Sequence, residues 1–193
     1  MRLFILSTML YLSCSITAQN KPYYYTIPDT PITYTAATVA ARMVDGLGFR
    51  YFWATEGLTE KDLAFSPGDS TRSTMATLEH IQGQTDILFY AANKKPTDFT
   101  TPPVKLGFTE LREKTLNNIK VASELLKQPG INLEEMDMIF QRANGKTEFP
   151  FWNLINGPIS DALWHIGQVV TFRRSSGNPL PEGVNVLRGT KTN

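Results

Sequence analysis

The sequence predicts an all-α protein: a four-helix bundle with one long crossover connection and a short β-hairpin before the last helix. Four stretches of the chain repeat apolar residues at the spacing of one helix face. Prolines and glycines interrupt the chain between these stretches, as expected for loops. An Asn-Gly pair at 144–145 lies between two short apolar runs, a strong local signal for a hairpin spanning 138–142 and 146–149.

The first two expected helices cover about residues 35–57 and a stretch that ends near Ala92. Gly46 and Gly48 lie inside the first, and two glycines there indicate close approach of neighbouring helices. A loop over 58–71 follows, and the oxygen atoms of residues 69–71 (Asp, Ser and Thr) are candidate N-caps for the second helix.

The third expected helix begins at a Thr109 cap and ends near Lys127, before Pro129-Gly130. The fourth shows an unbroken pattern over 159–174 and ends at Gly177. Pro158 has no amide hydrogen, so either this helix begins near Asn156 or an earlier turn is kinked at the proline. The tail after residue 181 is polar, and we expect it to be loose.

The composition indicates one ordinary globular domain, with boundaries expected at 19–193. The 193 residues include 19 basic and 18 acidic side chains, a net charge of +1, which argues against a nucleic-acid partner. A homodimer is compatible with this composition.

Residues 1–18 have the features of a secretory signal peptide: Arg2, a short apolar run and then small residues up to Ala18. The apolar run is too short for a transmembrane helix. We therefore expect an exported protein, periplasmic or secreted. The alternative is a lipoprotein anchored at Cys14, the single cysteine of the chain. With the leader removed, the domain has no thiol nucleophile and no cysteine metal ligand.

Asp161 and His165 are the candidate functional pair of the last helix. They are four residues apart, so both side chains leave the same helix face about 6 Å apart. An ionised Asp161 beside His165, on a face flanked by apolar residues, is expensive to bury unless it is paired or binds a cation. The other histidine, His80, lies in the second expected helix. If His80 meets this pair, the three side chains supply three N/O metal ligands and leave coordination positions open.

Two segments resemble the DinB/YfiT-like superfamily of metal-binding four-helix bundles. STMATLEHIQGQ, which carries His80, resembles the family's first ligand helix, and DALWHIGQVVTFRR resembles its closing helix. The family motif there is His-x-x-x-His followed by Gly-Gln, matched at Gly167-Gln168. His165 matches the last ligand, and Asp161 stands where the family usually has histidine.

The resemblance implies a divalent ion such as zinc or nickel, and iron or manganese also suit a more oxygen-rich site. It implies a metal-dependent hydrolase or a thiol-type transferase acting on a small-molecule substrate, with a low-molecular-weight thiol as a candidate cosubstrate. The ion would lower the pKa of a bound water or thiol. The alternative is a non-catalytic metal-binding or partner-binding bundle. Two histidines and one aspartate are also the ligand set of mononuclear iron oxygenases, although such sites usually lie on all-β scaffolds.

Several other residues are weaker candidates. Gln168 could bind a substrate or a metal-bound water, and Asp45 could orient a ligand imidazole. Trp53 and Trp164 could line a pocket, although core packing is the default role for such residues. Arg173-Arg174 could bind an anion or stabilise the end of their own helix.

Overall fold

The fold is a bundle of four long helices, as predicted. The structure is a computed structural model that describes residues 21–29 and 31–192. Within this part of the chain the long helices are α1 (Ala36–Thr55), α3 (Thr74–Ala92), α4 (Phe108–Leu126) and α6 (Ser160–Ser176). The expected signal peptide and Cys14 lie outside the described residues. Among the described helices, none is long and apolar enough to cross a membrane.

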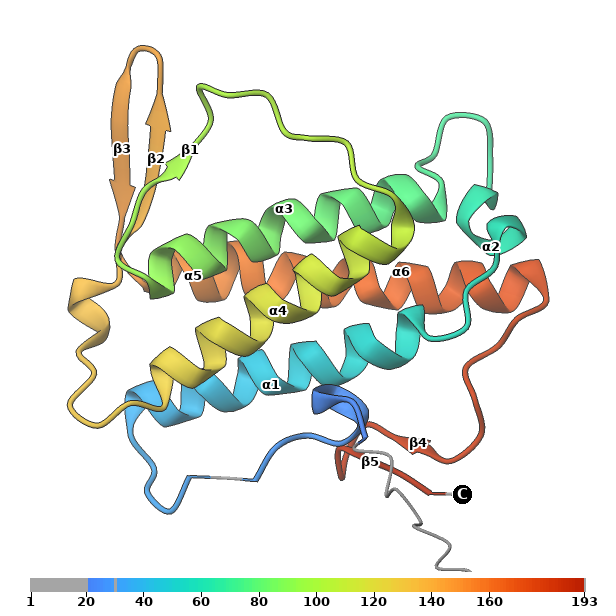
Figure 1. Ribbon diagram of the computed structural model, residues 1–193, viewed down its shortest axis with the longest axis horizontal. Helices are drawn as coiled ribbons and strands as arrows, with labels where there is room; N and C mark the ends of the chain where they lie inside the picture. The colour runs from blue at the N-terminus through green and yellow to red at the C-terminus, as the bar shows by residue number, and fades with distance from the viewer. Residues whose placement is uncertain (1–20, 30, 193) are drawn as a thin grey trace, which may run out of the picture.

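The helices pack in a ring in which α1 and α3 each contact both α4 and α6. In Figure 1, α1 and α6 run in one direction while α3 and α4 run in the other. Because α3 and α4 are parallel, residues 93–107 must return along the whole bundle to connect them (Figure 1). This return is the long crossover predicted from the sequence.

Two of the predicted helix caps are wrong. The side chain of Ser73, not those of residues 69–71, accepts a hydrogen bond from the Ala76 amide at the start of α3. Gly107 is the N-cap of α4, so Thr109 lies inside that helix. The expected loop before α3 also contains the short helix α2 (Glu60–Ala64).

Helical turns before Asn156 continue through Pro158 into the last helix, so the second of the two predicted alternatives, an earlier turn that is distorted at the proline, is the one observed. A short helix α5 (Trp152–Leu154) leads into the π-helical turn η3 (Ile155–Ile159), which continues directly into α6. The missing amide hydrogen of Pro158 falls inside this turn, where the wider winding accommodates the ring. Gly177 has a φ of 97° and ends α6, as predicted.

The predicted hairpin consists of β2 (Met138–Arg142) and β3 (Gly145–Phe149). A further strand, β1 (Thr97–Asp98), comes from the crossover and pairs in parallel with β2. A 3-10 turn, η2 (Leu133–Glu135), precedes the hairpin. The order of the resulting sheet is β1-β2-β3.

The C-terminal tail is ordered, contrary to the prediction that it is loose. Strands β4 (Val184–Asn185) and β5 (Thr190–Lys191) form a second hairpin. The Ile27 amide donates to the carbonyl of Gly189, which ties this hairpin to the N-terminal segment and its 3-10 turn η1 (Tyr23–Tyr25). Both termini of the described chain therefore pack on the α1 side of the bundle (Figure 1).

The glycines of α1 allow close approach, but at Gly48 the approaching group is a side chain. A Cβ atom at this position would lie 2.6 Å from Cε1 of Tyr24. The Tyr24 ring is buried, and its hydroxyl points at the buried carboxylate of Asp45. Gly48 thus makes room for the N-terminal segment.

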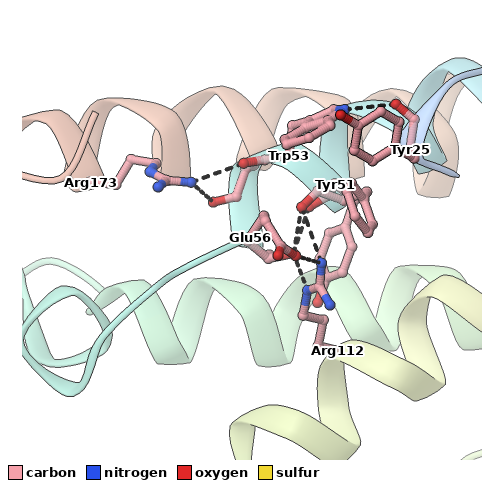
Figure 2. Close-up of polar contacts among 9 residues, drawn as sticks. Tyr25, Tyr51, Trp53, Glu56, Arg112 and Arg173 are labelled. Carbon is pink, nitrogen blue, oxygen red and sulfur yellow. Dashed lines mark hydrogen bonds and ion pairs between the residues drawn. The ribbon is translucent and has the colours of Figure 1, made fainter. Parts of the chain in front are cut away.

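Two arginines close the C-terminal end of α1 (Figure 2). Arg173 from α6 donates to the carbonyls of Trp53 and Ala54, at 2.9 and 3.1 Å. Arg112 from α4 donates to Glu56 and to the Thr55 hydroxyl. The last carbonyls of a helix have no partner within the helix and carry partial negative charge, so these cations stabilise its end.

Candidate metal centre

The structure brings the three predicted ligands together across α3 and α6. His80 lies in the first half of α3 and faces Asp161 and His165 in the first half of α6, because α3 packs against α6. One ligand atom from each side chain lies within 4.8 Å of the other two. The His80 and His165 rings stand nearly perpendicular, with centroids 4.5 Å apart.

Asp161 is the central residue of this His80–Asp161–His165 triad, since each of its oxygens faces one imidazole. Oδ2 lies 2.8 Å from His80 Nε2, and Oδ1 lies 3.5 Å from His165 Nε2. Two ligand atoms on one tetrahedral zinc ion are about 3.4 Å apart, given bond lengths of about 2.1 Å. The His165 pair matches this spacing. The His80 pair is at hydrogen-bond distance, so an ion between its atoms requires a small outward rotation of that ring.

Gln168 holds the His165 ring from the far side. Its Oε1 lies 2.7 Å from His165 Nδ1, so the amide oxygen accepts the Nδ1 hydrogen. In the neutral imidazole this leaves Nε2 with a lone pair that faces the Asp161 carboxylate. Two acceptors that face each other require a cation or a proton between them, which is the environment of a metal ligand.

The triad is accessible to solvent. The side chains of His80, Asp161 and His165 retain 29%, 34% and 15% of their exposed area. Gln84, one turn after His80, places its amide nitrogen 3.3 Å from His80 Nε2. An ion held here would therefore be within reach of water or a small molecule.

Comparisons with family models, with curated proteins and with solved structures find no match to this chain. The DinB/YfiT-like resemblance therefore depends on the motif residues alone.

Other candidate residues lie away from the triad. Asp45 is buried and pairs with Lys127 Nζ at 2.6 Å and with the Ser123 hydroxyl. Trp53 packs in the core, as predicted, and its indole nitrogen donates to the Tyr25 carbonyl (Figure 2). Arg173 is buried at the end of α1, so it stabilises a helix other than its own and is not available to an anionic substrate.

Trp164 and Gln168 are the residues whose roles differ most from the simplest sequence interpretation. Trp164 is 75% exposed, so core packing was the wrong role for it. Gln168 is the orienting group of the site. The spacing of three residues between His165 and Gln168 was the sequence signal for this contact, because residues three apart are neighbours on a helix surface.

A cavity at one end of the bundle is a different feature. It has a volume of about 790 Å³ and lies between the start of α1, residues 131–134 and residues 150–155. None of the triad residues lines it. Its size therefore says nothing about the chemistry of the triad.

Proposed function

We propose that His80, Asp161 and His165 bind one divalent metal ion, and that the protein is a metal-dependent hydrolase or a thiol-type transferase acting on a small molecule. The observation that carries the proposal is the convergence of these three side chains, from two helices, on one point within 4.8 Å. Two imidazoles and one carboxylate suit zinc, nickel, iron or manganese.

The ligand number favours a catalytic over a structural ion. Structural zinc sites usually have four protein ligands, whereas catalytic sites have three and keep an open position. The bundle core packs around other residues, since all three triad side chains are partly exposed. The fold therefore does not depend on an ion at this place.

The chemistry follows from the donor set and its surroundings. A divalent ion supplies a Lewis acid that lowers the pKa of a water or thiol at its open position. His80 and His165 hold and orient the ion, and Asp161 supplies the negative charge. Residues 19–193 contain no cysteine, so a thiol must come from a small cosubstrate.

Metal analysis of the purified protein tests the proposal. We expect about one divalent ion per chain, lost in H80A, D161A and H165A and retained in D69A, a matched change of an exposed aspartate in a loop. The absence of bound metal in the wild type, or its retention in all three triad variants, would overturn the proposal.

A second measurement separates catalysis from simple binding. Water-proton relaxation of the manganese form should detect exchangeable water at the ion, and a chelator should abolish ester hydrolysis or thiol conjugation. If the ion binds without exchangeable water, the enzyme proposal fails and a non-catalytic metal-binding bundle remains.

A further inference from the structure

The hairpin carries an unpaired strand edge. Among the described strands, β3 pairs with β2 on one side and with none on the other. Figure 1 shows the hairpin extending away from the helices, with β3 on its outer side. Residues 145–148 are exposed, so another strand can approach this edge.

The parallel strand on the far side of β2 shows which backbone groups of β3 point outward. The Phe99 amide donates to the Gln141 carbonyl, so the backbone of Gln141 bonds toward β1. Gln141 lies opposite Lys146, and the two cannot exchange hydrogen bonds while Gln141 faces away. The amide and carbonyl groups of Lys146, and of Glu148 two residues on, therefore point to the free edge.

Charge selects one way of pairing this edge with itself. In an antiparallel pair centred on Thr147, Lys146 lies opposite Glu148 of the second copy and Glu148 opposite its Lys146. Both are pairs in which the outward backbone groups can bond. The neighbouring registers with the same hydrogen-bonding pattern place Lys146 opposite Lys146, or Glu148 opposite Glu148, which is destabilising. A lone lysine on an edge opposes pairing, but this lysine has a complementary glutamate at the right spacing.

Contacts within one chain also hold the β2–β3 hairpin in position without a partner. Phe140 makes edge-to-face contacts with Phe99 and Phe149, at 5.3 and 5.8 Å between ring centroids. The Arg142 guanidinium lies over the Phe99 and Phe140 rings. An edge that is already rigid loses less conformational entropy on pairing.

We propose that the β3 edge (Gly145–Phe149) is a homodimer interface, in which two copies pair antiparallel about a two-fold axis at Thr147. The resulting sheet has six strands, in the order β1-β2-β3-β3-β2-β1. The two threonines face each other across the axis, and such pairs favour strand association. The same patch on both copies satisfies the symmetry of a closed dimer.

The dimer is weak, because a pair of five-residue strands buries far less than the roughly 1,600 Å² of a standard interface. We expect a dissociation constant on the order of 10 to 100 µM. Sedimentation velocity over a concentration series that spans this range should show monomer converting to dimer.

Charge reversal tests the register. The K146E variant places two carboxylates opposite each other at both pairs and should raise the dissociation constant at least about tenfold. The double variant K146E/E148K exchanges the two charges and should restore dimerisation to within about threefold. Both changes are at exposed positions, and circular dichroism checks that the fold is kept.

A cysteine at the axis gives an independent test. Facing residues in a pair that does not exchange hydrogen bonds have Cα atoms about 4.5 Å apart, which a disulfide can span. In a C14S background, T147C should form a covalent dimer on mild oxidation, and T101C, in the exposed crossover, should not. A protein that stays monomeric throughout the series, or a dimer that is unchanged by K146E and not trapped by T147C, would overturn the proposal.

Discussion

Gln168 decides which nitrogen of His165 is free to bind an ion. The amide oxygen accepts the Nδ1 hydrogen at 2.7 Å, which fixes both the tautomer and the direction of Nε2. This is the usual role of a residue behind a metal-binding imidazole, and such residues influence affinity strongly. Gln168 contacts the ring nitrogen of His165 that does not face Asp161, so we assign it as a positioning residue.

Replacing Gln168 by alanine should lower metal affinity about 10- to 100-fold without unfolding the protein. Q168E keeps an oxygen acceptor and should recover most of the affinity. Competition titration with a chromophoric chelator measures both, and Q128A, at an exposed glutamine just after the C-terminal end of α4, serves as the control. Equal affinities in Q168A and the wild type would remove Gln168 from the site.

Replacing Gly48 and Gly83, two helical glycines, by alanine should change the stability of the fold in opposite directions. A Cβ at Gly48 would clash with the Tyr24 ring, whereas a Cβ at Gly83 meets nothing within 4 Å among the described atoms. Alanine is favoured over glycine in a helix by about 1 kcal/mol. We expect G83A to raise the free energy of unfolding by about 0.5–1 kcal/mol and G48A to lower it by about 1–3 kcal/mol. Urea unfolding measures both; stabilisation by G48A would mean that Tyr24 does not occupy this space.

At the level of elements, Asp62 connects α2 to the end of α6. Its carboxylate accepts hydrogen bonds from the Ser176 hydroxyl, the Asn178 amide and the Thr59 backbone amide. Burial raises the pKa of Asp62, but these hydrogen bonds together outweigh it and hold the pKa well below the ordinary value of 3.8. The short helix α2, which the sequence did not predict, is fixed by this network.

A depressed pKa means that Asp62 stabilises the fold in its ionised form. The contribution is complete above 3.8, the pKa expected in the unfolded chain, and is lost as the pH falls below that value. D62N should therefore lower the free energy of unfolding by about 2 kcal/mol near pH 7, and by progressively less below about pH 4. Urea titrations at several pH values measure this, and D69N, an exposed aspartate, should show no such trend. A D62N deficit that stays constant with pH would contradict the assignment.

The sequence predicted the parts of the fold that local periodicity determines and missed those fixed by distant contacts. The buried positions Leu111, Ile119 and Ala122 of α4 follow the helical repeat. The N-cap of α3 could not be predicted from the helical repeat. Residues 69–71 have the same side-chain oxygen chemistry as Ser73, so the sequence does not distinguish them. The Ser73 side-chain cap, together with a bond from the Thr74 amide to the Phe65 carbonyl in the preceding loop, fixes the start of the helix at the later residue.

Two of the candidate ligands, Asp161 and His165, were predictable for the same reason, and so was the contact between His165 and Gln168, which are three residues apart. The spacing of Asp161 and His165 places them together on any helix. His80 joins them only through the packing of α3 on α6, which the sequence motif indicated and periodicity could not. The π-helical turn before α6 likewise depends on Pro158 together with the Ser160 hydroxyl, which donates to the Ile155 carbonyl at 2.6 Å.

At the scale of the whole described chain, the triad lies on a different side of the bundle from η1 and from the β4–β5 hairpin. The triad is on α3 and α6, whereas η1 and the β4–β5 hairpin pack on the α1 side, and α1 and α3 occupy opposite corners of the ring. A Cβ at Gly189 would lie 2.5 Å from Ile27, so the tail fits closely against the N-terminal segment. Changes to the tail should thus affect stability and leave the metal site intact.

Deleting residues 183–193 should lower the free energy of unfolding by about 1–3 kcal/mol, because Ile27 and its apolar neighbours lose their cover. Metal affinity should stay within about twofold of the wild type, since the triad lies on α3 and α6 and the tail packs on the α1 side. I27A should reproduce part of the loss, whereas L187A, a change at a side chain that is 91% exposed, should have no effect. Urea unfolding and chelator competition on the same samples separate the two properties. If the deletion leaves the free energy of unfolding unchanged, the sequence prediction of a loose tail was right. If the deletion abolishes metal binding, the two sides of the bundle are coupled.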